Sequence, residues 1–482
     1  MLKIDFYKKG KYTMNDVGTS NLFIDCFSDE LVYCADAGDW YFWNGKNWER
    51  DTILKRNEMI KQLYKYVISY IFEQKLDVDK QSELLKYYNK LADKNFRDKI
   101  IKDAMSIRPI KSSVFDSHKL LFNCQNGTYD FATGKFREHR KEDYLTDISN
   151  VVYDPNAKAP RFEQYLQEVM ENDQTKVDYL LKLAAYCLTG DTSRECFIVF
   201  YGDKTRNGKG TFVSTLTYLS GTYTQTIKSS SITKKQVNGG GTGATPDIAK
   251  LKHARIANVN EIEEGMQLDV ALMKEITGGD TMTARFLYKE EFDFVPQFKP
   301  LINTNVLPRM SDDSIFKSDR IQLLCFDRHF ELNERDINLK DKLKAETNGI
   351  FNVIAPYYKK LQEEGFILPE STRKTLEQYK LNSNNVMAFV KDNLFESKNS
   401  MEKSSDLYKK YAEWCEQEGL TKQAQKNFKE RMIRLGATYC EKGYGKNDKG
   451  ESGNSIWVKG FTFTEPKNTL TPYLIQDDEL PF

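Results

Sequence analysis

The stretch that decides the fold is CFIVFYGDKTRNGKGTFVSTLTYL, residues 196–219. Its first part, CFIVF, is a short run of apolar, β-branched and aromatic residues, which is typical of a strand buried on both faces. A loop containing glycines follows, and FVSTLTYL then has apolar residues at helical spacing. Strand, glycine loop and helix in this order form the context that a phosphate-binding P-loop needs.

The loop supplies candidate ligands for a nucleotide phosphate. Glycines let backbone N–H groups converge on phosphate oxygens, and a lysine, here Lys209, can neutralise the charge of the phosphates. The loop departs from the standard pattern in two ways. A glycine-rich surface turn is therefore the alternative to a phosphate site. The loop is one residue longer than usual, and Gly210 replaces the usual Ser or Thr, so Thr211 is expected to supply the Mg²⁺-binding hydroxyl. The candidate set is Gly202, Asn207, Gly208, Lys209, Gly210 and Thr211.

Three further apolar segments carry polar residues suited to nucleotide hydrolysis. ARIANVNEIEEG (254–265) ends in acids, of which Glu261 can polarise the attacking water and support the metal ion. KPLINTN (299–305) ends in Asn305, which can orient water near the γ-phosphate. In KSDRIQLLCF, Arg320 precedes the last strand and can complete a neighbouring subunit's site as an arginine finger. Each alone would be an ordinary strand end, but this ordered set rarely arises by chance.

The alternation of these strands with helical material indicates an α/β sheet covered by helices. Upstream, WYFWNGKNWERD (40–51) has the Asn-Gly of a tight hairpin between aromatic strands. Residues 56–106 repeat apolar side chains at helical spacing, and residues 120–139 return to short strands and turns. Beyond Pro369, polar helices precede a turn and a strand.

Composition excludes several classes of protein. The 482 residues contain 71 Lys and Arg against 70 Asp and Glu, so any nucleic-acid site must concentrate positive charge locally. No apolar run approaches the ~20 residues of a membrane span, and the start lacks a signal-peptide core, so a cytosolic protein is expected. The eight cysteines form no CxxC pair and the four histidines are scattered, which favours free thiols over a zinc site.

Together the motifs resemble the phage/plasmid primase–helicase family, relatives of the poxvirus primase-helicase, whose motor is a superfamily 3 AAA+ helicase. The resemblance covers roughly residues 120–461. NGTYDFATGKF and YLLKLAAYCLTGD resemble the region before that motor, NGKGTF its P-loop, and TPDIAKLKHARIANVNEIEEG its Walker B region. EITGGDTMTARFLYKEEFDFVP resembles its B′ element, LINTNVLPRM its sensor 1, and SDDSIFKSDRIQLLCF its arginine-finger segment.

The resemblance implies an ATP-dependent DNA helicase with ATP and Mg²⁺ as cofactors. It implies a ring, usually a homo-hexamer, that pulls single-stranded DNA through its pore during phage or mobile-element replication in the host bacterial cytoplasm. Thr211 and Glu261 would hold the metal ion. The implied catalytic residues are Lys209, Glu261 as the Walker B acid, Asn305 as sensor 1 and Arg320 as the finger.

Two segments are candidates for DNA contacts. Family members place the hairpin of the B′ element in the pore, where Arg285 or, by preference, Lys289 would touch phosphates; an ordinary amphipathic hairpin is the alternative. Residues 404–463 have the helix, turn, helix and hairpin order of a winged helix, which can also dock proteins. Its candidate DNA contacts are Lys422, Lys426, Lys429 and Arg431, with Lys446 and Lys449 in the wing.

The C-terminal end, QDDELPF, resembles the acidic tip of bacterial single-stranded-DNA-binding proteins. The acids of such a tip dock on a basic rim while the terminal Phe fills a pocket. We therefore expect this tail to recruit host proteins that bind that tip, and a merely disordered acidic end is the alternative. The candidate partner-binding residues are Asp477, Asp478, Glu479, Leu480, Pro481 and Phe482.

The predicted architecture is α/β, with an AAA+ P-loop motor, a mixed α+β N-terminal region and a C-terminal winged helix. Residues 1–115 contain no convincing DxD/His polymerase set, since Asp77 and Asp79 lie in a polar helical stretch. A primase–helicase with primer synthesis and a low-turnover ATP-binding initiator scaffold remain the alternative functions. The predicted segments are 1–115 (N-terminal), 116–165 (family-specific), 166–345 (motor), 346–382 (helical linker), 383–463 (winged helix) and 464–482 (acidic tail).

Overall fold

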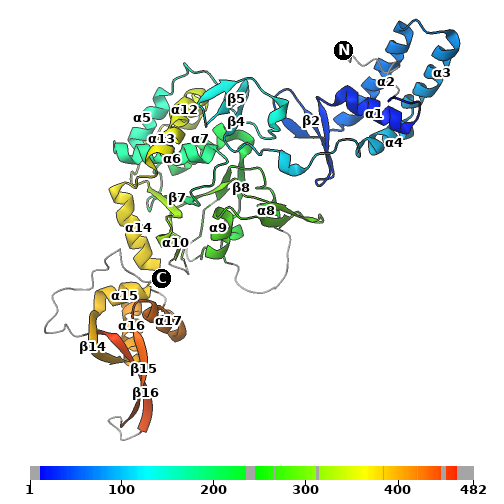
Figure 1. The fold of residues 1–482 in the computed structure, drawn as a ribbon. Helices are drawn as coiled ribbons and strands as arrows, with labels where there is room; N and C mark the ends of the chain where they lie inside the picture. The colour runs from blue at the N-terminus through cyan, green and yellow to red at the C-terminus, as the bar shows by residue number, and fades with distance from the viewer. Residues whose placement is uncertain are drawn as a thin grey trace. The chain divides into compact units, whose positions relative to one another are not determined.

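The structure is a computed structural model, and it describes residues 11–234, 245–259, 261–263, 266–310, 314–383, 385–418, 420, 422–446 and 452–463. The chain divides into two compact units, which are described separately (Figure 1). The first unit comprises Met1–Pro308 and Asp319–Pro369, and the second comprises Arg309–Ser318 and Glu370–Phe482.

The first unit is built on a five-stranded parallel sheet with the order β13-β7-β12-β9-β8. All five residues of β13 are buried, as are the first four of β7, because helices cover the sheet. This confirms the α/β prediction and the buried strands. The strands are β7 (Phe197–Tyr201), β8 (Thr224–Ile227), β9 (Ile256–Val259), β12 (Lys299–Thr304) and β13 (Ile321–Cys325).

Helices and a small antiparallel sheet share one hydrophobic core with the parallel sheet. Phe200 of the sheet contacts Phe212 of α7, and Phe122 of the small sheet stacks on Phe351 of α12. Figure 1 shows α12 and α13 beside α6, in agreement with their contacts. These elements are β4 (Leu121–Cys124), β5 (Gly127–Asp130), β6 (Lys135–Arg137), α5 (Pro160–Val169), α6 (Gln174–Leu188), α7 (Lys209–Ser220), α11 (Leu339–Ala345), α12 (Thr347–Ile354) and α13 (Pro356–Glu364).

Structural elements or contacts cross the predicted segmentation at three places. The boundary at 165/166 lies inside α5, whose buried face packs into the core on both sides of it. The predicted linker 346–382 is divided, because α12 and α13 belong to the core of the first unit and the second unit begins at Glu370. The boundary at 115/116 is crossed by hydrogen bonds, including one from the Trp48 amide to the Leu145 carbonyl.

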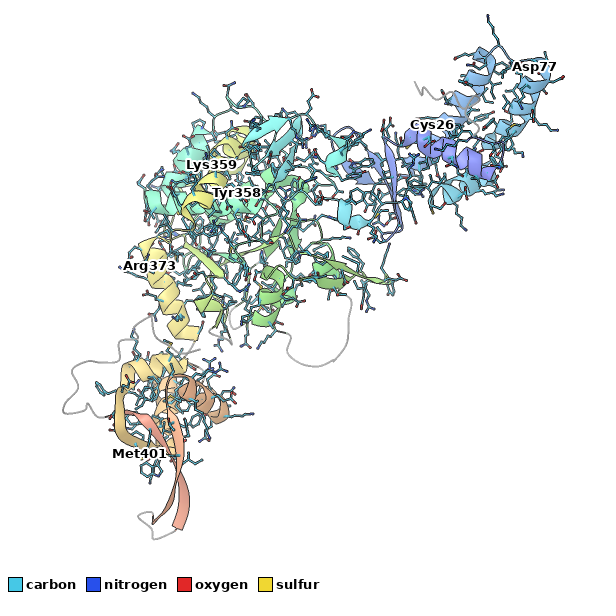
Figure 2. All side chains as sticks on the ribbon, viewed as in Figure 1. Cys26, Asp77, Tyr358, Lys359, Arg373 and Met401 are labelled. Atoms are coloured by element: carbon cyan, nitrogen blue, oxygen red, sulfur yellow. The ribbon has the colours of Figure 1, made fainter. Side chains whose placement is uncertain are left out.

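The N-terminal region combines an antiparallel sheet with a helical cluster. Residues 44–47, which begin with Asn44 and Gly45, connect β2 to β3, so the predicted hairpin forms with a four-residue loop. Asp77 caps α3 by accepting the amide of Lys80, which is a structural role for this carboxylate (Figure 2). The elements are α1 (Asp16–Phe27), β1 (Leu31–Cys34), β2 (Asp39–Trp43), β3 (Trp48–Arg50), α2 (Lys55–Glu73), α3 (Val78–Tyr88) and α4 (Lys94–Ala104).

The insertion between β9 and β12 contains a two-stranded hairpin, β10 (Met282–Arg285) and β11 (Glu291–Phe294), preceded by α9 (Val270–Thr277). The short helix α8 (Pro246–Ala249) lies before β9 and contacts β10.

The second unit has its own core and a three-stranded antiparallel sheet with the order β14-β16-β15. Two helices followed by a hairpin occur in the order that the sequence predicts. The elements are α10 (Ser314–Lys317), α14 (Glu370–Ser383), α15 (Asn385–Asn393), β14 (Phe395–Lys403), α16 (Ser404–Gln417), α17 (Gln425–Arg434), β15 (Thr438–Lys446) and β16 (Ser452–Thr462). Across the described parts of both units, every helix is too short or too polar to cross a membrane.

Candidate nucleotide site and DNA-facing hairpin

The glycine loop, residues 202–208, connects the carboxyl end of β7 to the first turn of α7. Gly208 has φ +90°, and a Cβ there would lie 2.5 Å from Val169 Cγ1, so only glycine fits without strain. Gly202 is equally confined, since a Cβ would meet the Asn207 amide and the Phe326 carbonyl. Arg206 takes a left-handed conformation with φ +59°, which is uncommon for a residue other than glycine.

Lys209 connects the glycine loop to the end of the central strand β12. Its ammonium donates to Asn305 Oδ1 at 2.6 Å and to the Gly202 carbonyl at 3.1 Å. Burial lowers the pKa of Lys209 to about 8, although the charges of Glu261 and Asp203 oppose this shift. The two residues that the sequence assigned to phosphate binding and to sensor 1 are therefore brought into direct contact.

The remaining nucleotide candidates surround this contact. Asn207 is buried, its amide donates to the Lys204 carbonyl, and its Oδ1 accepts the Lys209 amide. Glu261 is exposed just after β9, and its carboxylate acts electrostatically on the Lys209 ammonium. Thr211 lies in the first turn of α7, half-buried. At Gly210 a Cβ would meet no atom within 4 Å, so space does not require the glycine there.

The donor set fits a nucleotide-borne magnesium ion. Mg²⁺ is commonly held by one or two protein oxygen ligands together with substrate phosphates and water. Thr211 offers a hydroxyl in the first turn of α7 and Glu261 a carboxylate just after β9, so both lie near the carboxyl ends of the strands. The buried ammonium of Lys209 and the amides at the start of α7 supply positive potential for the phosphates.

Arg320 lies at the amino-terminal ends of the strands, whereas the glycine loop lies at their carboxyl ends. Its carbonyl accepts the amide of Phe197, the first residue of β7, whereas the glycine loop follows the last. The length of β7 separates the two edges by about 13 Å. The guanidinium of Arg320 pairs with Glu195 and donates to Thr277 Oγ1 at 2.7 Å. Arg320 is therefore not assembled with Lys209 within one chain.

A segment that the sequence did not single out follows β13 and runs along the glycine loop. His329 Nδ1 lies 2.8 Å from the Thr205 carbonyl, so this nitrogen carries the hydrogen. The Phe330 amide donates to the Arg206 carbonyl at 3.0 Å. On the opposite side, the Tyr165 hydroxyl donates to the Gly208 carbonyl at 2.8 Å. The only sequence signal for this segment is its position after a strand that pairs with β7, and that pairing is visible only in the fold.

The hairpin of the B′ element extends from the first unit with both predicted cations near its turn. Arg285 and Glu291 face each other across the strands, with Nη1 and Oε1 3.9 Å apart. Lys289 is exposed in the turn. Arg285 is therefore partly compensated by an acid, while Lys289 lies beyond the paired strands.

Strand β11 and the segment after it are connected to residues 112–116. Lys252 donates to Ser112 Oγ at 2.8 Å and lies 5.0 Å from the centre of the Phe292 ring in β11. Gln297, just after β11, donates to the Asp116 carbonyl at 3.0 Å. These contacts connect the N-terminal half of the unit to the hairpin, and no motif in the sequence indicated them.

The C-terminal candidates belong to the second unit. Lys426 and Lys429 are exposed on α17, and the Lys429 ammonium lies 5.0 Å from the Tyr439 ring centre. Arg431 is half-buried and Lys422 is exposed. Lys449 and the tail residues 477–482 lie outside the described residues, as does the side chain of Lys446.

Comparison with known proteins gives matches over most of the chain. The family described as D5 N terminal like matches residues 20–171, a range that crosses the boundary predicted at 115/116. A candidate helicase of Acanthamoeba polyphaga mimivirus is 25% identical over 457 residues, which cover 86% of this chain and 47% of the relative. A candidate helicase of Invertebrate iridescent virus 3 is 23% identical over 368 residues, which cover 66% of this chain and 38% of the relative.

This chain thus spans about half or less of the length of these curated relatives. Among solved structures, the apo C-terminal region of NrS-1 matches with a TM-score of 0.45 and 11% identity, covering 89% of this chain and 96% of that one. A second apo structure of that region matches with a TM-score of 0.40 and 13% identity, covering 65% of this chain and 78% of that one.

Proposed function

Because the family match and the viral relatives confirm the resemblance to primase-helicases, we propose that this chain is an ATP-dependent helicase acting on single-stranded DNA in viral or mobile-element replication. The observation that carries the proposal is the 2.6 Å contact between Lys209 and Asn305. It joins a phosphate-binding lysine to a polar residue at the end of the adjacent strand, as nucleotide hydrolysis requires.

In this proposal, different side chains of the protein have different roles at the nucleotide. Lys209 and the amides at the start of α7 bind the phosphates, and Asn305 orients the attacking water. Glu261 accepts a hydrogen bond from that water, and Glu261 and Thr211 would hold a magnesium ion. When bound, Mg²⁺ would neutralise part of the phosphate charge.

The position of Arg320 supports a ring, with six subunits as the expected number. Since Arg320 lies at the opposite sheet edge from its own Lys209, it can act only on a neighbour's nucleotide. Each subunit would then hold ATP on one face and present its finger on the other, which is the head-to-tail kind of interface that forms rings when its rotation closes. Superfamily 3 AAA+ membership is part of this proposal and rests on the sequence motifs.

A subunit-mixing experiment tests the ring. Lys209→Ala and Arg320→Ala chains should each lose ATPase activity, and mixing them should restore part of it, because some interfaces then pair an intact lysine with an intact arginine. Glu195→Gln is the matched control, since it removes the intrachain partner of Arg320 and keeps the arginine. No recovery on mixing, with mixed rings demonstrated by cross-linking, contradicts the trans role.

The second unit is proposed to be a winged helix that binds DNA, with Lys426 and Lys429 on α17 contacting phosphates. The order of α16, α17 and the β15–β16 hairpin supports this assignment. The C-terminal tail is proposed to recruit host replication proteins on the strength of its sequence alone. Deleting the last six residues should abolish binding to a purified host protein that binds the acidic tip of single-stranded-DNA-binding proteins. Undiminished binding would refute this role.

A second candidate function is a low-turnover, ATP-binding initiator scaffold. It is favoured by Gly210, which lacks the usual hydroxyl although the space around it would admit one. ATPase assays with and without single-stranded DNA separate the candidates. Hydrolysis that depends on Lys209 and is stimulated by DNA supports the helicase, whereas ATP binding without such hydrolysis supports the scaffold.

A further inference from the structure

The guanidinium of Arg320 is held by two residues of its own chain. Nη1 donates to Thr277 Oγ1 at 2.7 Å and to the Glu195 carbonyl at 3.3 Å, and Nη2 pairs with the Glu195 carboxylate. These contacts occupy both terminal nitrogens of the group, and the side chain is only 16% exposed. An arginine finger must direct its N–H donors at a neighbour's phosphates. Arg320 therefore has to leave these partners before it can act in another subunit.

The hydroxyl of Thr277 is arranged to accept a hydrogen bond from the arginine. Thr277 is the last residue of α9, it is buried, and its hydroxyl donates to the Met273 carbonyl one turn earlier at 2.7 Å. Because a hydroxyl has a single hydrogen, its remaining capacity is that of an acceptor, which the Arg320 N–H uses. A hydrogen bond from a charged donor is stronger than one between neutral groups, so this contact contributes substantially to holding Arg320.

The segments that carry the ion pair have uncommon backbone conformations. Glu195 has φ +46°, and Asp319, which precedes Arg320, has φ +51°. Both values lie in the left-handed region, which costs stability and is found preferentially at sites that change state. The Glu195 side chain is also 50% exposed, so water can replace the arginine as its partner when the pair opens. The contact is thus a closed arrangement that can open at moderate cost.

We infer that Thr277 and Glu195 form a clasp that holds Arg320 back, and that Arg320 leaves this clasp to act on the neighbouring subunit's nucleotide. The inference rests on the proposed trans role of Arg320 and adds two positioning residues to it. The clasp and the nucleotide compete for the same N–H donors, so weakening the clasp should favour the engaged arginine. A purely structural ion pair has the opposite consequence, because its loss would disturb the start of β13 and lower activity.

Steady-state ATPase kinetics of Thr277 variants test the inference. Thr277→Val removes the acceptor and retains the shape of the side chain, so kcat should rise about threefold to tenfold, with a change of less than about twofold in KM for ATP. Thr277→Ser keeps the hydroxyl and should behave as wild type does. Thr347→Val, which removes another buried threonine hydroxyl from the first unit, is the matched control. The double variant Thr277→Val/Arg320→Ala should be as inactive as Arg320→Ala, because the gain depends on the arginine.

An unchanged or lowered kcat in folded Thr277→Val overturns the clasp, as does a gain that persists without Arg320. Thermal melting monitors the folding of each variant. If Thr277→Val does not fold, Glu195→Gln tests the same clasp: it should raise kcat, and an unchanged or lowered kcat overturns the inference. Failure of the proposed function is distinct, because wild type would then show no hydrolysis that depends on Lys209 and Arg320.

Discussion

The ammonium of Lys209 lies 2.6 Å from the side-chain oxygen of Asn305, a residue 96 positions later in the chain. The contact joins the start of α7 to the end of β12 across the carboxyl edge of the parallel sheet. Asn305 and the Gly202 carbonyl accept hydrogen bonds from the buried ammonium of Lys209, the group proposed to bind phosphate. Nucleotide binding is therefore expected to exchange these acceptors for phosphate oxygens.

Replacing Asn305 should impair hydrolysis more than binding. Asn305→Ala removes the group proposed to orient water, so kcat should fall about 10²-fold, while the Kd for ATP should change much less. Steady-state ATPase kinetics and equilibrium binding of an ATP analogue measure the two effects. Asn303→Ala, on the same strand, is the matched control. A loss of binding as large as the loss of kcat would assign Asn305 to phosphate binding.

Nucleotide affinity should depend on pH above about 8. In the free protein, burial lowers the pKa of Lys209 to about 8, and bound phosphate raises it again. Below pH 8 the lysine is already charged, so affinity should be constant. Above pH 8 binding must take up a proton, and affinity should fall about tenfold per pH unit. Calorimetry in buffers of different ionisation enthalpy detects that proton. Lys209→Arg, which stays charged, should abolish the dependence if it binds at all.

His329 is expected to position the glycine loop. Its Nδ1–H donates to the Thr205 carbonyl, and losing a hydrogen bond of this kind should weaken ATP binding about three- to tenfold in His329→Ala. His329→Asn retains an N–H donor and should recover most of the affinity. Equilibrium binding of an ATP analogue measures both variants. If His329→Asn behaves like His329→Ala, the hydrogen bond to the Thr205 carbonyl does not account for the loss.

Gly208, at the end of the glycine loop, and Gly210, in the first turn of α7, should respond oppositely to alanine. Gly208→Ala places a Cβ against Val169 at φ +90°, which should lower the free energy of unfolding by about 2–4 kcal/mol. Gly210→Ala meets no atom within 4 Å and lies in the first turn of α7, so it should be neutral or stabilising by up to about 1 kcal/mol. Chemical denaturation measures both. A destabilised Gly210→Ala would show that the loop backbone differs from this description.

The base of the hairpin should couple DNA binding to the N-terminal half of the unit. Lys252→Met removes the hydrogen bond to Ser112 and the cation above Phe292, so DNA stimulation of the ATPase should fall several-fold. Hydrolysis without DNA should be affected less, because Lys252 does not contact the glycine loop. Ser112→Ala should have a smaller effect of the same kind. A proportional loss of both activities would indicate general destabilisation.

Much of the first unit could be predicted from short stretches of the sequence. The strand CFIVF, the glycine loop and the helix after it are encoded by residues adjacent in the chain, and the apolar runs ending in Glu261 and Asn305 are legible as strand ends. The Asn-Gly hairpin after β2 and the helical spacing of α2 were predictable for the same reason. The segment boundaries at 165/166 and within 346–382 were not, because α5, α12 and α13 join the core through packing that leaves no local signature.

The sequence by itself therefore determined which elements form and which side chains stand at their ends. Only the tertiary structure decided which of these strand and helix ends lie next to one another. The order β13-β7-β12-β9-β8 brings Asn305 to Lys209 and His329 to the glycine loop, and it leaves Arg320 at the opposite edge. The physical reason is that strand pairing in a parallel sheet is made through crossovers between distant segments. Helical and strand propensities act over a few residues and carry no information about those partners.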